Sequence, residues 1–396
     1  MAFFHNRTVN LLNLHTVVSM AALAGGGAFY SAYLLTAGVS VPVVLLANAA
    51  IFGVRLVLRS FLLALAVRIG LRRLVSVGAL LMAVQFPLVA EVHGLGVALL
   101  ALVLASAAGD TIYWPSYHAY YASLGDAEHR GQQLGIREAM TAVVGIVSPL
   151  AAGWLLVRFG PRLAFAVTAL VQALSALPFL WTPDVPVLRR APGAFRAAFS
   201  GIALFIADGW IAAGYMIAWQ IALFLALGRD FLAYGGALAI AALVGAVGGV
   251  ALGRLIDAGK GTRAVWLALG TLAFVVVLRA GVQDHPALAI AANALGSLAG
   301  CLYIPTLMTA VYNQAKRSPC PLRFHIAAEA GWDIGIAAGC GSAALLLRLG
   351  FSLSAAVLSA LFGVATVFVL LRRYYTAHET EAVDRTLLQP EETPNI

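Results

Sequence analysis

Long apolar stretches, separated by short polar turns, make up most of the chain. Twelve of them reach the ~17–25 residues that a helix needs to cross the hydrocarbon core of a bilayer. They lie at residues 12–36, 41–67, 74–91, 94–122, 131–157, 161–182, 197–227, 231–256, 262–282, 286–313, 323–348 and 351–372. Both faces of such a helix can be apolar, so length defines these elements better than helical periodicity does. The pattern predicts an all-α integral membrane protein with twelve transmembrane helices.

The composition agrees with this prediction and excludes other classes. Hydrophobic residues make up 62% of the chain and charged residues 11%, whereas soluble domains average about 45–50% and 25%. The net charge of +8 does not indicate a nucleic-acid partner, because Lys and Arg recur in short loops instead of gathering on one face or tail. The three cysteines have no paired spacing, so we expect no metal and no cofactor. Residues 1–15 lack a compact cleavage site before the next spans, and we expect a retained first helix.

The basic residues predict an orientation, because cytoplasmic loops of membrane proteins are enriched in Lys and Arg. With the N-terminus in the cytoplasm, most of the 25 Lys and Arg residues fall on the cytoplasmic side. Arg55 and Arg59 fall within the membrane, and five others fall outside: Arg158, Arg162, Arg229, Arg279 and Arg348. We therefore expect a multi-pass protein of the cell (inner or plasma) membrane with both termini in the cytoplasm.

A Pro-rich, basic segment at Thr182–Phe195 leaves six spans on each side. The two sides repeat at an offset of 190 residues, since residues 155–160 (LLVRFG) match residues 345–350 (LLLRLG) and Gly145 matches Gly335. A parallel repeat of this kind is typical of one large transporter architecture. We expect two pseudo-symmetric six-helix halves at 1–182 and 197–373, a cytoplasmic connector at 183–196 and a disordered acidic tail at 374–396.

The second span carries two arginines within its apolar sequence. An Arg at the centre of a spanning helix costs roughly 2.5 to 3.5 kcal/mol on insertion scales, so two of them indicate a function or a partner. Asn48, Arg55 and Arg59 fall within about 40° of one another around the helix and form one polar stripe. The span ends in a basic turn that contains Arg68, Gly70 and Arg72.

These features together resemble the major facilitator superfamily (MFS) of secondary transporters over nearly the whole chain. The family signature G-x-L-x-D-R-x-G-R-R between helices 2 and 3 is represented here by Leu65, Arg68, Gly70 and Arg72, but Val67 stands where the family has an acid. A second copy after helix 8 keeps Gly253, Leu255 and Asp257. The resemblance implies that these turns and Arg59 take part in gating, and that Asp257 keeps the acid's role in the second half only.

Polar and aromatic residues form two further stripes within the spans. Asp110, Trp114, Tyr117 and Tyr121 share one face of the fourth helix, and Asp208, Tyr215 and Trp219 share one face of the seventh. Aromatic stripes at this spacing are more often packing than a ligand site, but a carboxylate near mid-membrane favours a functional role. The resemblance places helices 1, 4, 7 and 10 around a central cavity. We therefore include these aromatic residues, with Asn48 and Arg55, among the candidate substrate-binding residues.

Acidic residues on the fifth and eleventh helices add to the candidates. Glu138 lies at the start of the fifth helix, and Glu329 and Asp333 lie on the eleventh. Arg59 and Asp333 are at similar depths from their basic turns, and the resemblance brings helices 2 and 11 together. Arg59 is therefore expected either to form an ion pair between the halves or, with Arg55, to bind an anion, and the two are compatible.

These residues predict a secondary active transporter, coupled to protons, that moves a small organic solute by alternating access. The candidate proton carriers are Asp110, Glu138, Asp208, Glu329 and Asp333, since a buried acid that exchanges partners can take up and release a proton. The expected partners are a small-molecule substrate, protons and the lipid bilayer, and we expect a monomer.

Two other classes remain as alternatives. Val67 favours a sensor built on a transporter scaffold that does not transport, whereas the intramembrane acids favour transport. A membrane-embedded transferase would need a reactive cluster at a membrane face or a sizeable soluble loop, and the longest internal loop is the short connector. We therefore expect that the protein is not an enzyme.

Overall fold

The computed structural model is built of helices. It describes the backbone of residues 6–124, 130–187, 189–257 and 261–388, and the side chains of these residues except 122, 130–139, 250, 252–257, 321 and 378–388. Within this part of the chain, twelve helical segments are long and apolar enough to cross a membrane. They coincide with the twelve predicted stretches, with boundaries that differ by several residues at most ends.

The first six spans extend from Arg7 to Trp181. Span 1 is interrupted at its glycine run and consists of α1 (Arg7–Ala24), the 3-10 turn η2 (Gly26–Phe29) and α2 (Tyr30–Thr36). Spans 2 to 6 are α3 (Val41–Ile69), α4 (Leu71–Ala90), α5 (Val97–Leu124), α6 (Arg130–Phe159), and α7 (Pro161–Leu174) with η3 (Leu177–Trp181).

The second six spans begin after the connector. Span 7 consists of the short η4 (Arg196–Ala198), α8 (Phe199–Ala212), the π-helix η5 (Ala213–Ala218) and α9 (Trp219–Ala226). Spans 8 to 12 are α10 (Phe231–Asp257), α11 (Gly261–Gly281), α12 (Pro286–Arg317), α13 (Pro321–Arg348), and α14 (Leu353–Leu358) with α15 (Ala360–Leu388).

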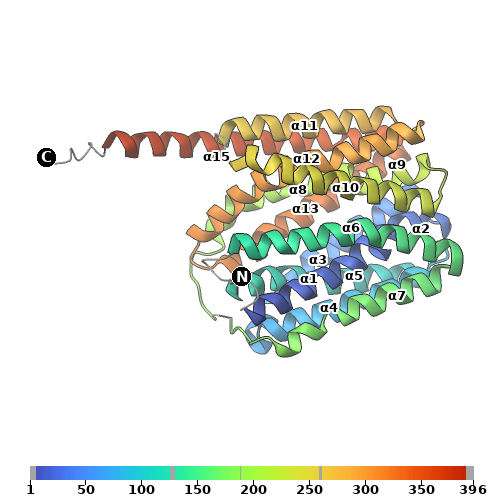
Figure 1. Cartoon of the computed structure of the whole chain (residues 1–396), viewed down its shortest axis with the longest axis horizontal. Coiled ribbons are helices and arrows are strands. Elements are labelled where there is room, and N and C mark those ends of the chain that lie inside the picture. The colour runs from blue at the N-terminus through green and yellow to red at the C-terminus, as the bar shows by residue number, and fades with distance from the viewer. Residues whose placement is uncertain (1–5, 125–129, 188, 258–260, 389–396) are drawn as a thin grey trace.

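The spans run side by side in one bundle. Figure 1 shows α1, α3, α4, α5 and α7 in the lower part of the bundle and α8, α11, α12 and α13 in the upper part. The helix α1 begins, and α15 leaves the bundle, at the same end, which we call the terminal end (Figure 1). Large apolar side chains such as Phe61, Leu100, Phe274 and Phe362 are exposed on its surface, as expected of a surface that faces lipid.

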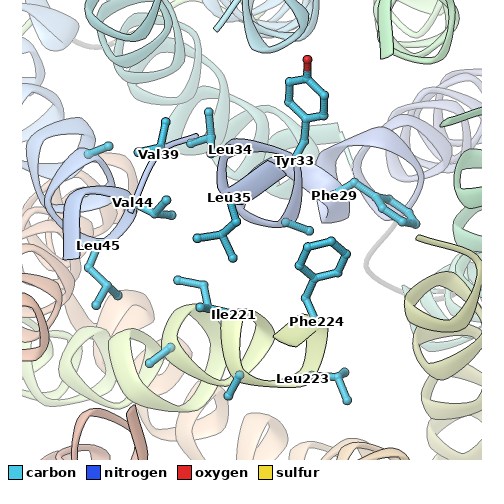
Figure 2. Packing of buried hydrophobic residues seen from close by; sticks show 14 of the residues in the cluster. Phe29, Tyr33, Leu34, Leu35, Val39, Val44, Leu45, Ile221, Leu223 and Phe224 are labelled. Atoms are coloured by element: carbon cyan, nitrogen blue, oxygen red, sulfur yellow. The ribbon is translucent and has the colours of Figure 1, made fainter. Parts of the chain in front are cut away.

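Contacts between spans that are far apart in the sequence hold the first six spans against the last six. The helix α3 packs against α13, and α6 packs against α10. Away from the terminal end, Leu35 of α2 and Leu45 of α3 face Ile221 and Phe224 of α9 in one apolar cluster (Figure 2). Burial of such side chains between the first and last six spans stabilises their present arrangement.

The chain differs from expectation near its C-terminus. The helix α15 continues to Leu388, beyond the boundary at 373 where disorder was predicted, and projects from the bundle (Figure 1). The sequence from 374 to 388 contains many helix-forming residues and no Gly or Pro, so it can continue the preceding helix. Residues 389–396 of the predicted tail lie outside the described residues.

Candidate functional site

Arg59 on α3 joins the first half of the chain to α13. Its Nη2 and Nε lie 2.5 and 2.9 Å from Oδ2 of Asp333, and its Nη1 donates to Glu329 Oε2 at 3.0 Å. The ion pair expected from the matching depths of Arg59 and Asp333 is therefore present, and Glu329 extends it. Arg59 is 4% exposed and Asp333 is 0% exposed, so these charges depend on one another for stabilisation.

Arg55, about one turn nearer the middle of α3 than Arg59, contacts two acids on different helices. Its Nη1 lies 3.4 Å from Asp110 Oδ2 on α5, and its Nε lies 3.0 Å from Asp333 Oδ1 on α13. Among the described residues, neither Arg55 Nε nor Asp333 Oδ1 has a well-aligned hydrogen-bond partner. The guanidinium also lies 4.8 Å from the ring centre of Phe52 and 5.7 Å from that of Trp332. Arg55 is thus held by charge and ring contacts rather than by a complete set of hydrogen bonds.

We call Arg55, Arg59, Asp110, Glu329 and Asp333 the ionic cluster. It contains three carboxylates and two guanidinium groups, so it carries one excess negative charge when all five are ionised. Two more titratable groups lie within electrostatic reach of its acids, His325 near Glu329 and Tyr30 near Asp110. An excess charge in a buried network favours the binding of a compensating proton or cation.

Part of the aromatic stripe on α5, together with Tyr113 beside it, faces α1. His15 of α1, which is fully buried, accepts from the Tyr113 hydroxyl at Nε2 (2.7 Å) while its Nδ1 donates to the Ser175 carbonyl (2.6 Å). The Tyr117 hydroxyl lies 2.6 Å from that of Thr16. Trp114 and Tyr121 of the same stripe are half-buried. The stripe therefore combines packing against α1 with partly accessible rings.

The stripe on span 7 faces α12. Asp208 accepts a hydrogen bond from the Tyr303 hydroxyl at 2.6 Å, and the Tyr215 hydroxyl donates to the Gly296 carbonyl at 2.7 Å. The Trp219 indole N–H donates to Asn293 Oδ1 at 3.0 Å, and its ring is 1% exposed. In this conformation each of these three side chains of span 7 has a hydrogen-bond partner on span 10.

Asn48, the last member of the polar stripe on α3, does not join the ionic cluster. Its side-chain amide donates to the Val44 carbonyl of its own helix at 2.8 Å, and its side chain is buried.

Within the described side chains, no group of His, Cys, Asp and Glu could hold a metal ion.

The turn between α3 and α4 contacts the start of the connector. Gly70 has a φ of 81°, which permits the sharp turn because it has no Cβ. Asp184 of the connector accepts from the Arg72 amide at 3.2 Å, and the Arg72 guanidinium donates to the Thr182 carbonyl at 3.2 Å. Arg68 is exposed beside this turn. The side chains of Glu138, Gly253 and Asp257, also expected to act in coupling or gating, lie outside the described residues.

Comparison with known proteins identifies the family. The profile of the Major Facilitator Superfamily matches residues 12–315. The chain belongs to this superfamily. As an MFS member it is a multi-pass secondary transporter of a small-molecule substrate and not an enzyme.

Solved MFS structures share the fold. The POT family transporter PepTSo aligns with a TM-score of 0.65 and 13% identity over 94% of this chain and 99% of its own. The human organic anion transporter MFSD10 (TETRAN) aligns with a TM-score of 0.66 and 15% identity over 92% and 99%. A search of curated protein sequences gave no match.

Sequence reasoning missed several polar residues of this MFS transporter. Tyr303 and Asn293, the partners of Asp208 and Trp219, are polar residues within span 10 and could have been noticed for that reason. Asp184 is the single acid of the Pro-rich connector. Arg279, which the charge count assigned to the outer side, lies in the last turn of α11 and is 4% exposed, and its burial was not expected from the sequence.

Proposed function

We propose that this MFS transporter moves a small organic anion together with, or in exchange for, protons. Its functional unit is a single chain in the cell membrane, with both termini in the cytoplasm. The two six-helix halves, 1–182 and 197–373, rock against each other and expose a central site alternately to the two sides, as the parallel repeat favours. The observation that carries this proposal is the ionic cluster, which links the halves and has one acid in excess.

The arginines of the cluster favour an anionic substrate. A guanidinium group binds a carboxylate through two parallel hydrogen bonds. Arg55 is suited to this role, because its contacts with Asp110 and Asp333 leave its Nε without an aligned acceptor. The fold is shared with a human organic anion transporter, which agrees with this substrate class. Half-buried Trp114 and Tyr121, on the helix that carries Asp110, favour an aromatic or amphipathic anion.

Substrate and proton then compete within the same network. An anion that pairs with Arg55 displaces Asp110, which becomes a largely buried carboxylate without an ion-pair partner, whereas Asp333 keeps Arg59. Such a group binds a proton rather than remain charged. When Arg59 also releases Glu329 and Asp333, the ion pairs between α3 and α13 are lost. The two halves can then separate where these helices meet. Asp208 is a second candidate proton carrier, held in this conformation by Tyr303.

Purified protein in liposomes tests this proposal with benzoate as the probe anion. An imposed pH gradient of one sign should drive benzoate accumulation above the level in protein-free vesicles. Asp110→Asn, which mimics the protonated acid, should abolish the response to the gradient while benzoate exchange without a gradient continues. Asp208→Asn should have the same effect if Asp208 carries a coupled proton, and it leaves the ionic cluster intact.

Glu91→Gln is the matched control, because Glu91 is exposed and pairs with exposed Arg162. Gradient-driven accumulation that persists in both Asp→Asn variants would contradict proton coupling through these acids. Saturable benzoate binding with no transport under any gradient would instead favour the sensor alternative.

A further inference from the structure

Arg279 on α11 is a buried cation that the ionic cluster does not include. Among the described side chains, no carboxylate forms an ion pair with it. Its guanidinium lies 4.1 Å from the ring centre of Tyr215 and 4.8 Å from that of Trp219, both on span 7. A charge within a membrane span usually has a functional role, and here its neighbours are two aromatic rings.

The same guanidinium completes the backbone of the π-helix η5. In an α-helix the Trp219 amide would donate to the Tyr215 carbonyl, four residues earlier. In span 7 the Trp219 amide is directed instead at the carbonyls of Gly214 and Met216, five and three residues earlier. Arg279 Nη1 donates to the Tyr215 carbonyl at 2.8 Å and so supplies the donor that the change of winding took away. A carbonyl without a donor inside a membrane would be costly.

The π-helix also brings the two rings into line. Residues four apart are offset by about 40° on an α-helix. A wider turn rotates each residue by less, so the offset between Tyr215 and Trp219 becomes smaller, and one guanidinium can lie over both rings. Their polar atoms then bond to Gly296 and Asn293 of α12.

The neighbouring helix leaves room for this arrangement. A Cβ at Gly296 would overlap Nη2 of Arg279 and would lie 3.1 Å from the Tyr215 hydroxyl oxygen. The residue at 296 must therefore be Gly for the guanidinium to reach the Tyr215 carbonyl. By contrast, a Cβ at Gly300, one turn along the same helix, would meet nothing within 4 Å.

We propose that Arg279 is a positioning residue that holds span 7 in its π-helical winding and thereby fixes Tyr215 and Trp219 against α12. Without it, residues 213–218 lose the donor for the Tyr215 carbonyl and open more readily. The consequence for transport rests on the proposed function, in which span 7 lines the substrate path. The local structural effect does not depend on any substrate.

Hydrogen–deuterium exchange on the full chain in lipid nanodiscs, without substrate, is the primary test. Arg279→Met removes charge and donors but keeps the length of the side chain. Exchange in the peptide that covers residues 213–220 should become about tenfold faster or more, the order of effect expected for loss of a hydrogen bond to a charged group. Exchange in α3 should stay unchanged. Gly296→Ala, which displaces an intact Arg279, should accelerate exchange in the same peptide.

Conservative and control variants separate positioning from general damage. Arg279→Lys keeps a charged donor but has no planar group to lie over the two rings, so exchange should be intermediate. Arg348→Met, at an exposed arginine, and Gly300→Ala should match the unmodified protein. The inference is overturned if Arg279→Met and Gly296→Ala leave exchange at 213–220 unchanged, or accelerate exchange equally along the whole chain.

Benzoate transport then tests the functional consequence. In Arg279→Met the KM for benzoate should rise several-fold more than the maximal rate falls, because binding residues are displaced while the ionic cluster is intact. Faster local exchange in a protein that does not transport benzoate would contradict the proposed function and support the positioning role of Arg279. Faster exchange with an unchanged KM would show that Tyr215 and Trp219 do not contact the substrate and would overturn the transport consequence.

Discussion

The acids of the ionic cluster differ in how many partners each would keep if one arginine were lost. Asp333 contacts both Arg55 and Arg59, whereas Arg59 is the one described ion-pair partner of Glu329. Loss of Arg59 therefore leaves Asp333 paired and Glu329 unpaired. The sequence predicted that an acid on the eleventh helix pairs with Arg59. The structure shows that, among the described side chains, Glu329 is the acid that depends on Arg59 alone.

Arg59→Ala should lower the free energy of unfolding by about 3–5 kcal/mol, the usual effect of removing one partner of a buried ion pair. Addition of Glu329→Ala should restore part of the loss, because no carboxylate then remains without a cation. Melting temperatures of the purified protein in one detergent measure both changes.

The exposed pair of Arg162 and Glu91 provides the control for this experiment. Their side chains are 78% and 51% exposed, so Arg162→Ala should change stability by no more than about 1 kcal/mol. A double variant that melts no higher than Arg59→Ala alone would show that Glu329 does not depend on Arg59.

At the scale of elements, the crossing of α6 and α10 depends on two glycines. A Cβ at Gly153 would lie 2.6 Å from the Phe231 carbonyl oxygen, and one at Gly235 would lie 2.5 Å from that of Pro149. These backbones approach closely because neither position carries a side chain. The crossing joins the first half of the chain to the second. The contact between α6 and α10 must therefore loosen if the two halves move apart near Gly153 and Gly235.

Gly153→Val should destabilise this closed crossing by about 1–3 kcal/mol, as overpacking of a tight contact does. Spin labels at Phe159 and Leu232, in a chain whose three cysteines are replaced by Ala, should report a larger fraction of long distances between α6 and α10. The matched control is Gly236→Val, because a Cβ at Gly236 would meet nothing within 4 Å. Equal distance distributions in the two variants would mean that close approach at Gly153 does not hold the crossing.

At the scale of the whole molecule, the two termini and the connector define one end of the bundle. The connector is fixed to both sides of that end, since Asp184 accepts from the Arg72 amide and the Arg189 carbonyl accepts from Arg323 of α13 at 2.9 Å. Its acid therefore lies beside the turn whose own sequence has Val67 in place of the family's acid. The even number of described spans puts both termini on the same side, and the distribution of basic residues favours the cytoplasm as that side.

Fluorescent protein fusions at Met1 and Ile396, which fluoresce in the cytoplasm, should both be bright. A fusion inserted at Asp284, in the turn between α11 and α12, should be dark because that turn lies at the opposite end. A dark fusion at either terminus, or a bright one at Asp284, would contradict the orientation.

The sequence by itself determined the number and approximate positions of the spans and the depth of Arg59 relative to Asp333. These properties depend on the length of apolar runs and on the rise per residue, which are local. The tertiary structure decided which polar groups meet: Asp208 with Tyr303, Trp219 with Asn293, and Arg279 with the carbonyl freed by the π-helix. Within a membrane the outward and inward faces of a helix are both apolar, so periodicity does not reveal which neighbour each face contacts. The winding of residues 213–218 likewise depends on a donor from another helix, and nothing in the sequence of that segment specifies it.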